Sequence, residues 1–151
     1  MPVKKNKTKT VLGWREWVSL PELGIENIKA KVDTGARTSA LHAFDVKINE
    51  ANEKRTVDFK MHPLQDNVDY VVECHADVIE ERDVTDSGGH RERRWVIETM
   101  AVIGDTKLPI EMTLTDRDTM KFRMLLGRTA LKSNFIVDPD KSYLTRPDDE
   151  S

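Results

Sequence analysis

Apolar and polar residues alternate along much of this chain with a period of two, which is the pattern of half-buried β-strands. The alternating runs are short, and they are separated by Gly, Pro, Asn and Asp, the residues that favour turns. The predicted strands are Trp14–Leu20, Ile28–Val32, Phe44–Ile48, Thr56–Met61, Tyr70–Ile79, Arg94–Ile103 and Leu108–Leu114. The fold class that this pattern predicts is mainly β, consistent with a small closed β-barrel.

Turn signals and one helical stretch complete the predicted order of elements. The third and fourth predicted strands flank residues 49–55 and form a predicted hairpin, and Gly104-Asp105 marks a further turn. Only Thr129–Phe135 has its apolar residues at helical spacing on one face. The sequence therefore predicts one short C-terminal helix beside the strands.

The composition narrows the class of protein. The chain has 151 residues, of which 34% are charged, and a formal net charge of -3, so its charge does not favour binding to nucleic acid. We expect one domain at residues 11–145, between a disordered basic N-terminus at residues 1–10 and an acidic tail at residues 146–151. No secretory signal or apolar run of membrane-spanning length is evident, and the single Cys74 cannot form an internal disulfide, so a cytoplasmic location is expected.

Two segments carry the candidate chemistry. Asp33-Thr34-Gly35 directly follows a predicted strand, and Leu125-Leu126-Gly127-Arg128 precedes the predicted helix. An isolated Asp-Thr-Gly is most often a simple turn. A later apolar segment ending in glycine, however, can pass close behind such a loop, because glycine permits two backbones to approach closely. The order, spacing and flanks of the two segments favour a braced loop that presents the Asp33 carboxylate.

These segments resemble the retropepsins, the dimeric aspartic peptidases of retroviral type. Together with Gly13–Glu16 and Thr113–Arg117 they resemble more closely one bacterial family, which carries the label of an ATP-dependent zinc protease and is also described as retropepsin-like. The resemblance extends over residues 11–139. It implies a retropepsin-like (acid protease) barrel. It also implies a link to an ATP-grasp ligase that adds glutamates to a ribosomal protein tail, because family members resemble proteins encoded near one.

The resemblance further implies hydrolysis of peptide bonds by a water molecule held between two aspartates. The chain has one Asp-Thr-Gly, so the second carboxylate would come from a second copy, with Asp33 meeting Asp33 across a two-fold axis. Thr34 would bond across that axis, and Gly35 would allow the tight turn and admit the substrate backbone. We therefore expect a homodimeric aspartic endopeptidase whose catalytic residues are Asp33, Thr34 and Gly35.

The expected substrate-binding residues lie beside this loop and in a separate turn. Ala36 carries no hydroxyl that could stabilise an ionised dyad, which suits chemistry nearer neutral pH. Ser87, Gly88 and Gly89 fall within residues 83–91, between the two motifs, where a retropepsin carries its mobile flap. An ordinary exposed hairpin turn is the alternative, and the motifs favour the flap.

Arg37 departs from the retroviral pattern. In that pattern an aspartate at this position pairs with the arginine that follows the glycine of the second motif. Here Arg37 and Arg128 are both basic, so that pair cannot form. For Arg128 we expect a structural role beside a carboxylate such as Asp116, Asp118 or Asp138. For Arg37 we expect contact with an acidic substrate, since a guanidinium binds carboxylates well.

Two other functions remain open from the sequence. One is a non-catalytic module of the same fold that binds a modification enzyme or its acidic product. The other is a zinc peptidase, although His42, His62, His75 and His90 are scattered and no zinc or P-loop motif is present. We expect no cofactor and assign no metal ligand, with zinc as a minor alternative. The expected partners are a second copy of the chain and a peptide or protein substrate, without nucleic acid or membrane.

Overall fold

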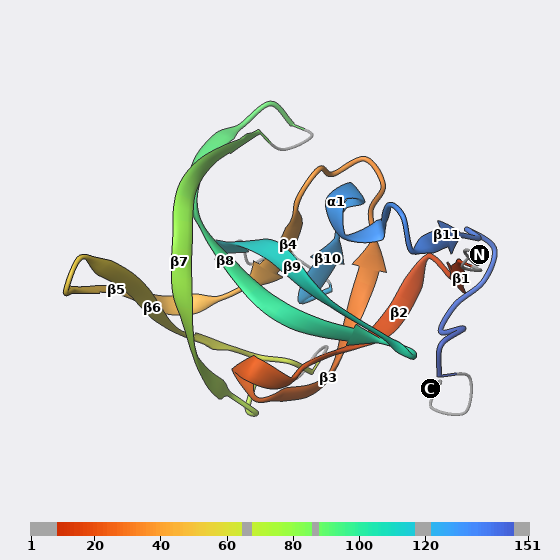
Figure 1. Cartoon of the computed structure of the whole chain (residues 1–151), viewed down its shortest axis with the longest axis horizontal. Helices are drawn as coiled ribbons and strands as arrows, with labels where there is room; N and C mark the ends of the chain where they lie inside the picture. The colour runs from red at the N-terminus through yellow and green to blue at the C-terminus, as the bar shows by residue number, and fades with distance from the viewer. Residues whose placement is uncertain (1–8, 65–67, 86–87, 117–121, 147–151) are drawn as a thin grey trace, which may run out of the picture.

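Six strands close into a barrel at the centre of the molecule (Figure 1). The computed structural model describes residues 9–64, 68–85, 88–116 and 122–146. Around the barrel the strands follow the order β2-β3-β10-β4-β9-β8, and a pairing of Ser19 with Val102 joins β8 back to β2. Their bounds are β2 Arg15–Leu20, β3 Ile25–Val32, β4 Ser39–His42, β8 Arg91–Ile103, β9 Thr106–Thr115 and β10 Met124–Leu126. The closed, mainly β fold that the sequence predicts is therefore confirmed.

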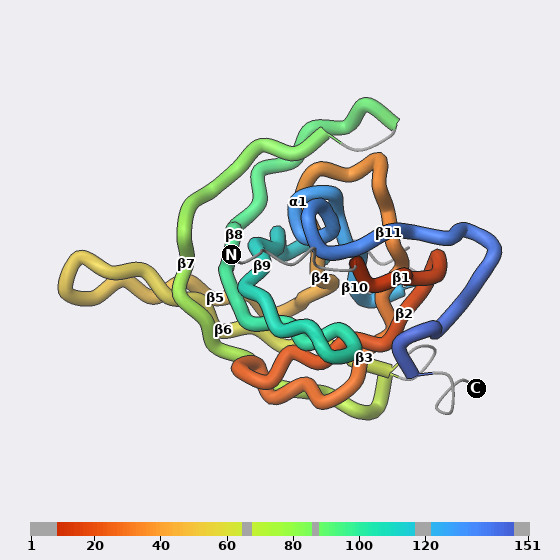
Figure 2. Tube along the Cα trace, turned by 45° about the vertical axis from the view of Figure 1, so that its right-hand side comes forward, coloured from red at the N-terminus to blue at the C-terminus, as the bar shows by residue number. Residues whose placement is uncertain are grey.

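Three further strands extend the sheet outward from β8. They are β7 (Val72–Thr85), β6 (Lys54–Met61) and β5 (Phe44–Ala51), hydrogen-bonded in the order β8-β7-β6-β5. Figure 1 and Figure 2 both show the β5–β6 hairpin projecting from one side of the barrel, and the far ends of β7 and β8 arching over another. The long strand β8 thus belongs both to the barrel wall and to the projecting hairpin that it forms with β7.

A second, two-stranded sheet joins the two ends of the described chain. β1 (Thr10–Leu12) runs parallel to β11 (Phe135–Val137), with Val11 opposite Ile136. Both of those side chains are exposed, whereas Leu12 and Phe135 are buried in the core. Within the described part of the chain, no helix has the length and apolar character needed to cross a bilayer.

The core follows from the alternation of apolar residues. In β2, for example, Val18 and Leu20 are fully buried, while Trp17 and Ser19 between them are only partly covered. The largest fully buried side chains are Leu12, Leu20, Ile25, Ile28, Leu41, Phe59, Met61, Ile97, Ile103, Met112, Met124 and Leu126. They come from β1 to β4, from β6 and from β8 to β10, so burial of apolar surface holds the barrel and β6 of its extension together.

The predicted short C-terminal helix is present, but it begins one residue earlier and ends four residues sooner than the predicted Thr129–Phe135. Helix α1 spans Arg128–Leu131 only, and Lys132 is already extended with φ -65° and ψ 149°. Ser133 has a φ of 83°, and Phe135 lies in β11 instead of on a helix. Phe135 is 6% exposed, so burial of its ring and pairing with β1 outweigh the helical spacing of the sequence.

Several strand boundaries also differ from the prediction. The loop expected at residues 49–55 shrinks to Asn52 and Glu53, whose φ values of 54° and 65° form a tight turn that suits the twist of paired strands. The polar residues around it are exposed on both faces, so alternation could not mark them as strand. The sequence pattern does not predict the short strands β1, β4 and β10. Thr10, expected to be disordered, lies in β1, and Arg146 donates a hydrogen bond to Ser19 Oγ.

Candidate functional site

The Asp33 loop is held between three strands of the barrel. β10 lies between β3 and β4, parallel to the first and antiparallel to the second. The chain leaves β3 at Val32, crosses the end of β10 and enters β4 at Ser39. The N–H of Asp33 donates to the carbonyl of Leu126 at 2.8 Å, so the loop begins with its backbone fixed to β10.

Within the loop, the Asp33 side chain is itself oriented by a hydrogen bond. Its Oδ1 accepts from the N–H of Gly35 at 3.1 Å, and its carbonyl accepts from the N–H of Ala36 at 3.2 Å. These two bonds make a compact turn. The turn supplies no hydrogen bond to Oδ2, the other oxygen of the half-buried carboxylate. The carboxylate is therefore presented on a restrained loop, as the sequence predicted.

Gly127 makes the close approach that its motif predicts. A Cβ built on Gly127 would lie 2.6 Å from the carbonyl carbon of Thr38 and 2.9 Å from the nitrogen of Ser39. The N–H of Gly127 also donates to Oγ of Ser39 at 3.0 Å. Only glycine fits behind the loop at this point, and Ser39, which the sequence did not single out, supplies the matching acceptor.

Gly35 differs from the expectation in one respect. Its φ is not in the left-handed region, so the turn does not require glycine for its backbone conformation. An added Cβ would meet only Asp33 Oδ1, at 3.4 Å. The absent side chain leaves open surface beside the carboxylate, so a role in admitting a substrate backbone remains the proposed reason for Gly35.

Arg128 has a structural role, although its observed partners are not carboxylates. Its Nη1 donates to the carbonyls of Thr34 and Gly35, both at 3.2 Å, and its N–H donates to the carbonyl of Ala36 at 2.8 Å. The N–H of Thr129 donates to the carbonyl of Arg37 at 3.1 Å. The first turn of α1 therefore uses its spare N–H groups to hold the loop. Of the expected carboxylates, Asp118 lies outside the described residues.

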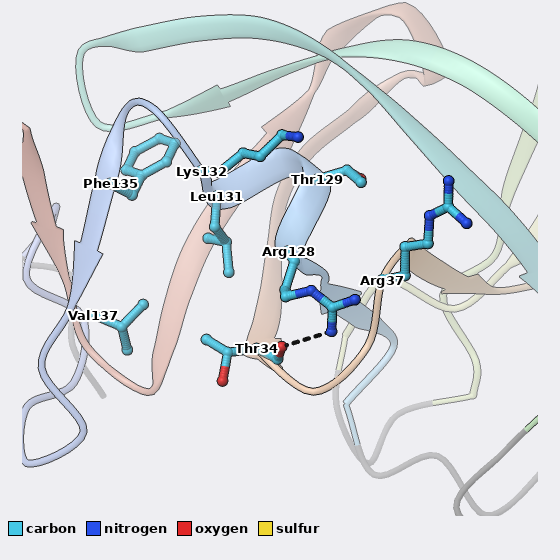
Figure 3. A pocket seen from close by; sticks show the side chains of 8 residues that line it. All are labelled: Thr34, Arg37, Arg128, Thr129, Leu131, Lys132, Phe135 and Val137. Atoms are coloured by element: carbon cyan, nitrogen blue, oxygen red, sulfur yellow. Dashed lines mark hydrogen bonds between the residues drawn. The ribbon is translucent and has the colours of Figure 1, made fainter.

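A pocket of about 400 Å³ lies between this loop, α1 and β11 (Figure 3). Its lining residues are Thr34, Arg37, Arg128, Thr129, Leu131, Lys132, Phe135 and Val137. The apolar members form one part of the lining, and Arg37, Arg128 and Lys132 bring three cations to it. Figure 3 shows Arg128 directed at Thr34, whereas the exposed Arg37 side chain points away from Thr34. An acidic group beside this pocket would meet a positive field.

The predicted flap corresponds to the hairpin of β7 and β8. Strand β7 ends at Thr85 and strand β8 begins at Arg91. Both strands therefore extend farther toward the hairpin tip than the predicted strands, which end at Ile79 and begin at Arg94. Gly88 and Gly89 are exposed at the tip, and Gly89 has a left-handed φ of 86°. Ser87 lies outside the described residues. In Figure 1 and Figure 2 the hairpin projects over the same end of the barrel as the loop joining β3 to β4.

The histidines and the cysteine do not gather around this loop. Cys74 and His75 lie on opposite faces of β7, as predicted, with Cys74 buried and His75 exposed. Burial raises the pKa of the Cys74 thiol to about 12. His75 Nδ1 lies 2.5 Å from Asp58 Oδ1, and this hydrogen bond lowers the pKa of Asp58. Among the described residues, no group of three or more His, Cys, Asp or Glu is placed to hold a metal ion.

A closed barrel with an Asp-Thr-Gly loop braced by a later Leu-Leu-Gly is the arrangement of a retropepsin-like protein. The chain belongs to the RimB-like family, described as retropepsin-like aspartic endopeptidase RimB, whose family model matches residues 11–148. That description contains neither zinc nor ATP, so the label of an ATP-dependent zinc protease is not confirmed.

Curated relatives have a different name. The chain is 45% identical over 135 residues to a "Probable alpha-L-glutamate ligase" of Parasynechococcus marenigrum, covering 89% of this chain and 29% of the relative. A relative of the same name from Shewanella pealeana is 38% identical, with 89% and 30% covered. The chain thus spans about three tenths of the length of the curated relatives it matches.

Solved structures share this fold, and one of them illustrates the match. It is the crystal structure of a protein with unknown function from Legionella pneumophila, with a TM-score of 0.76 and 23% sequence identity. The match covers 91% of this chain and 99% of that one. At this identity the similarity shows the fold alone.

Proposed function

We propose that two copies of this chain form an aspartic peptidase that hydrolyses acidic, glutamate-rich peptide segments. The observation that carries the proposal is the Asp33 carboxylate, oriented by Gly35 and held on a loop bonded to β10 and α1. The family description supports the reaction class. Each copy contributes one carboxylate, because the chain has a single Asp-Thr-Gly.

The proposed reaction is a general acid–base hydrolysis. The ionised Asp33 of one copy takes a proton from water as the water oxygen attacks the peptide carbonyl carbon. The protonated Asp33 of the other copy donates a hydrogen bond to the carbonyl oxygen and stabilises its developing charge. The tetrahedral intermediate then collapses, the C–N bond breaks, and the departing amine receives a proton from the dyad. No atom other than those of water and peptide is consumed.

The preference for acidic peptides rests on charge and on the relatives. Arg37, Arg128 and Lys132 line one pocket beside the loop. The curated relatives are named glutamate ligases, and this chain matches about three tenths of their length. A hydrolase domain joined to a ligase suggests that its substrate carries the glutamates that such a ligase adds. Charge-assisted hydrogen bonds from cations to these carboxylates contribute about 1.5–3 kcal/mol each.

Asp33→Asn tests the chemistry. The asparagine Oδ1 can still accept from Gly35, so the fold should persist, but the base is lost. Cleavage of an oligoglutamate peptide, followed by mass spectrometry, should fall by at least about 1,000-fold, which is in the range measured for loss of an essential catalytic group. Asp105→Asn, in an exposed turn between β8 and β9, is the matched control. Unchanged cleavage by a well-folded Asp33→Asn protein excludes the aspartic mechanism.

The same assay with an oligoglutamine peptide of equal length tests the charge preference, since only charge differs between the two peptides. We expect faster cleavage of the glutamate peptide and a smaller difference at high salt. Equal cleavage of both at low salt contradicts the acidic preference and leaves the peptidase intact.

A non-catalytic binding module is the second candidate, and the joining of this domain to ligases in the curated relatives favours it. In that case oligoglutamate should bind without being cleaved, and binding should not change in Asp33→Asn. Isothermal titration with both proteins separates the two functions.

A further inference from the structure

Two arginines on the arms of the β7–β8 hairpin form a cross-strand pair of like charges. Arg82 of β7 lies directly opposite Arg94 of β8, so their side chains share one face. Like charges placed in this way destabilise a sheet. The Arg94 side chain is 9% exposed and that of Arg82 27%, so both charges are also largely removed from water. Buried cations persist only where they are well paired, and each of these has a defined set of partners.

Arg82 joins three elements with one guanidinium. Its Nε donates to Glu80 on the same strand at 2.6 Å, and its Nη2 donates to Glu111 on β9 at 3.2 Å. Its Nη1 donates to Thr38 Oγ1, on the loop that follows Asp33, at 3.2 Å. Burial lowers the pKa of Arg82, but the bonds to the two glutamates outweigh burial and raise it overall. Arg82 therefore stays charged and fixes a hairpin arm to both the barrel and the loop.

Arg94 reaches the same part of the loop through a buried chain of hydrogen bonds. Paired with Glu92 at 3.0 Å, it donates from Nη1 to Thr113 Oγ1 at 3.3 Å. Thr113 Oγ1 donates to the carbonyl of Ser39 at 3.4 Å, and Ser39 Oγ accepts from the N–H of Gly127 at 3.0 Å. Thr113, Ser39 and Gly127 are all buried, so water competes little for these bonds.

Both sets of contacts end at Thr38 and Ser39, the two residues against which Gly127 is pressed. The neighbouring arginine on the same arm behaves differently. Arg93 pairs with Asp83 at 3.0 Å and with Glu81 at 3.5 Å, and its side chain is 59% exposed. Its ion pairs stay within the hairpin. The link from the hairpin to the loop thus belongs to one face of the arms only.

We propose that Arg82 and Arg94 are positioning residues that tie the β7–β8 hairpin to the Asp33 loop, so that the hairpin's position over a bound peptide sets the position of the carboxylate. The inference rests on the proposed function and on the expectation that this hairpin is the flap of the peptidase and covers the substrate. Neither arginine touches the reacting atoms. Both act through Thr38, Ser39 and Gly127, and only a planar, multidentate guanidinium can make the three divergent contacts of Arg82.

The kinetic test compares Arg82→Gln with Arg93→Gln, a matched loss of charge on the other face of the same arms. Misplacing a catalytic group by about 1 Å costs on the order of 100-fold. We expect kcat for oligoglutamate cleavage to fall about 10- to 100-fold in Arg82→Gln, with a smaller change in KM, and to stay near wild type in Arg93→Gln. Arg82→Lys should not restore kcat, because an ammonium cannot reproduce the three directions. Thr38→Val should lower kcat, and its effect should not add to that of Arg82→Gln.

A second readout does not need activity. Amide hydrogen exchange of the substrate-free protein at Ala36, Gly127 and Arg128, whose N–H groups form the loop's bonds, should be faster in Arg82→Gln than in Arg93→Gln. Unchanged exchange at these amides overturns the inference. An Arg82→Gln protein with a lower melting temperature but an unaltered kcat overturns it as well. If the wild-type protein cleaves no peptide, the proposed function fails, and the exchange experiment still decides whether the arginines hold the loop.

Discussion

At the scale of single residues, Gly127 braces the Asp33 loop from behind, because a Cβ added to it would lie 2.6 Å from the carbonyl carbon of Thr38. The Leu-Leu-Gly motif predicts this close approach. Its partner Ser39 could not be predicted, since serine in a run of small residues gives no sign of which distant N–H it accepts. The same holds for Arg82 and Thr38, which are 44 positions apart in the sequence.

Glu16 is a further residue that sequence patterns could not interpret. It lies in Gly13-Trp14-Arg15-Glu16, a segment that carries the family resemblance, and its side chain is fully buried. The carboxylate accepts from the N–H of Gly13 at 2.7 Å, the N–H of Leu144 at 2.8 Å and the hydroxyl of Thr145 at 2.9 Å. It therefore fastens the C-terminal segment to β2. A glutamate that follows Arg15 is expected to face solvent, and its partners Leu144 and Thr145 lie too far along the chain to be inferred from the local pattern.

Gly127→Ala should destabilise the protein without removing any charge. Its new methyl group would overlap backbone atoms of Thr38 and Ser39, which cannot swing aside as a side chain can. Overpacking of this kind costs about 1–3 kcal/mol, so the melting temperature should fall by roughly 3–10 °C. Gly35→Ala is the matched comparison for stability, since its Cβ would make only an ordinary contact at 3.4 Å. Similar melting temperatures for both variants would show that the Gly127 contact does not brace the loop.

At the scale of elements, alternation located the long strands and missed the places where both faces are polar or where the strand is very short. β7 and β8 run 14 and 13 residues, but their outer halves carry charges on both faces, so their pattern resembles a loop. The C-terminal end of helix α1 was predicted too late for the opposite reason. Its apolar spacing was helical, yet Phe135 is drawn into pairing with β1. Tertiary pairing overrode local preference there.

The hairpin tip and a distant turn offer a controlled comparison. Gly89 at the tip and Gly24 after the 3₁₀ turn η1 (Pro21–Leu23) both have left-handed φ, at 86° and 77°, and an added Cβ meets nothing within 4 Å at either. Replacing either glycine by alanine should cost stability by about 1–2 kcal/mol, because alanine disfavours that conformation. Only Gly89→Ala should change kcat and KM together for oligoglutamate cleavage, since it stiffens a predicted lid. Identical kinetics in the two variants would show that the tip is an ordinary turn.

At the scale of the whole molecule, one copy of this chain presents one candidate carboxylate. The pocket that Thr34 lines lies beside the Asp33 loop, and in the proposed dimer this loop would meet its counterpart from the second copy. Thr34 is exposed in the single chain, as a residue that bonds its own symmetry mate would be. The single motif predicts a second copy of the chain, and this stays a prediction. It could not predict the surface that binds that copy, because interface residues are not distinguished by composition alone.

Two measurements test the dimer. Activity per chain should fall on dilution, because a monomer holds half a dyad and association follows mass action. Mixing wild type with an equal amount of Asp33→Asn, followed by subunit exchange, should then leave about half of the original activity, since mixed dimers carry one functional carboxylate and are inactive. A chain that acts alone would keep all of its activity in the mixture and lose none on dilution.

Sedimentation velocity of the same samples supplies the physical control. The variant must form dimers as the wild type does, because only then does the mixing result report on the dyad. Activity that survives both dilution and mixing would rule out a shared Asp33 pair, and the reaction would then need a second group from within one copy of the chain.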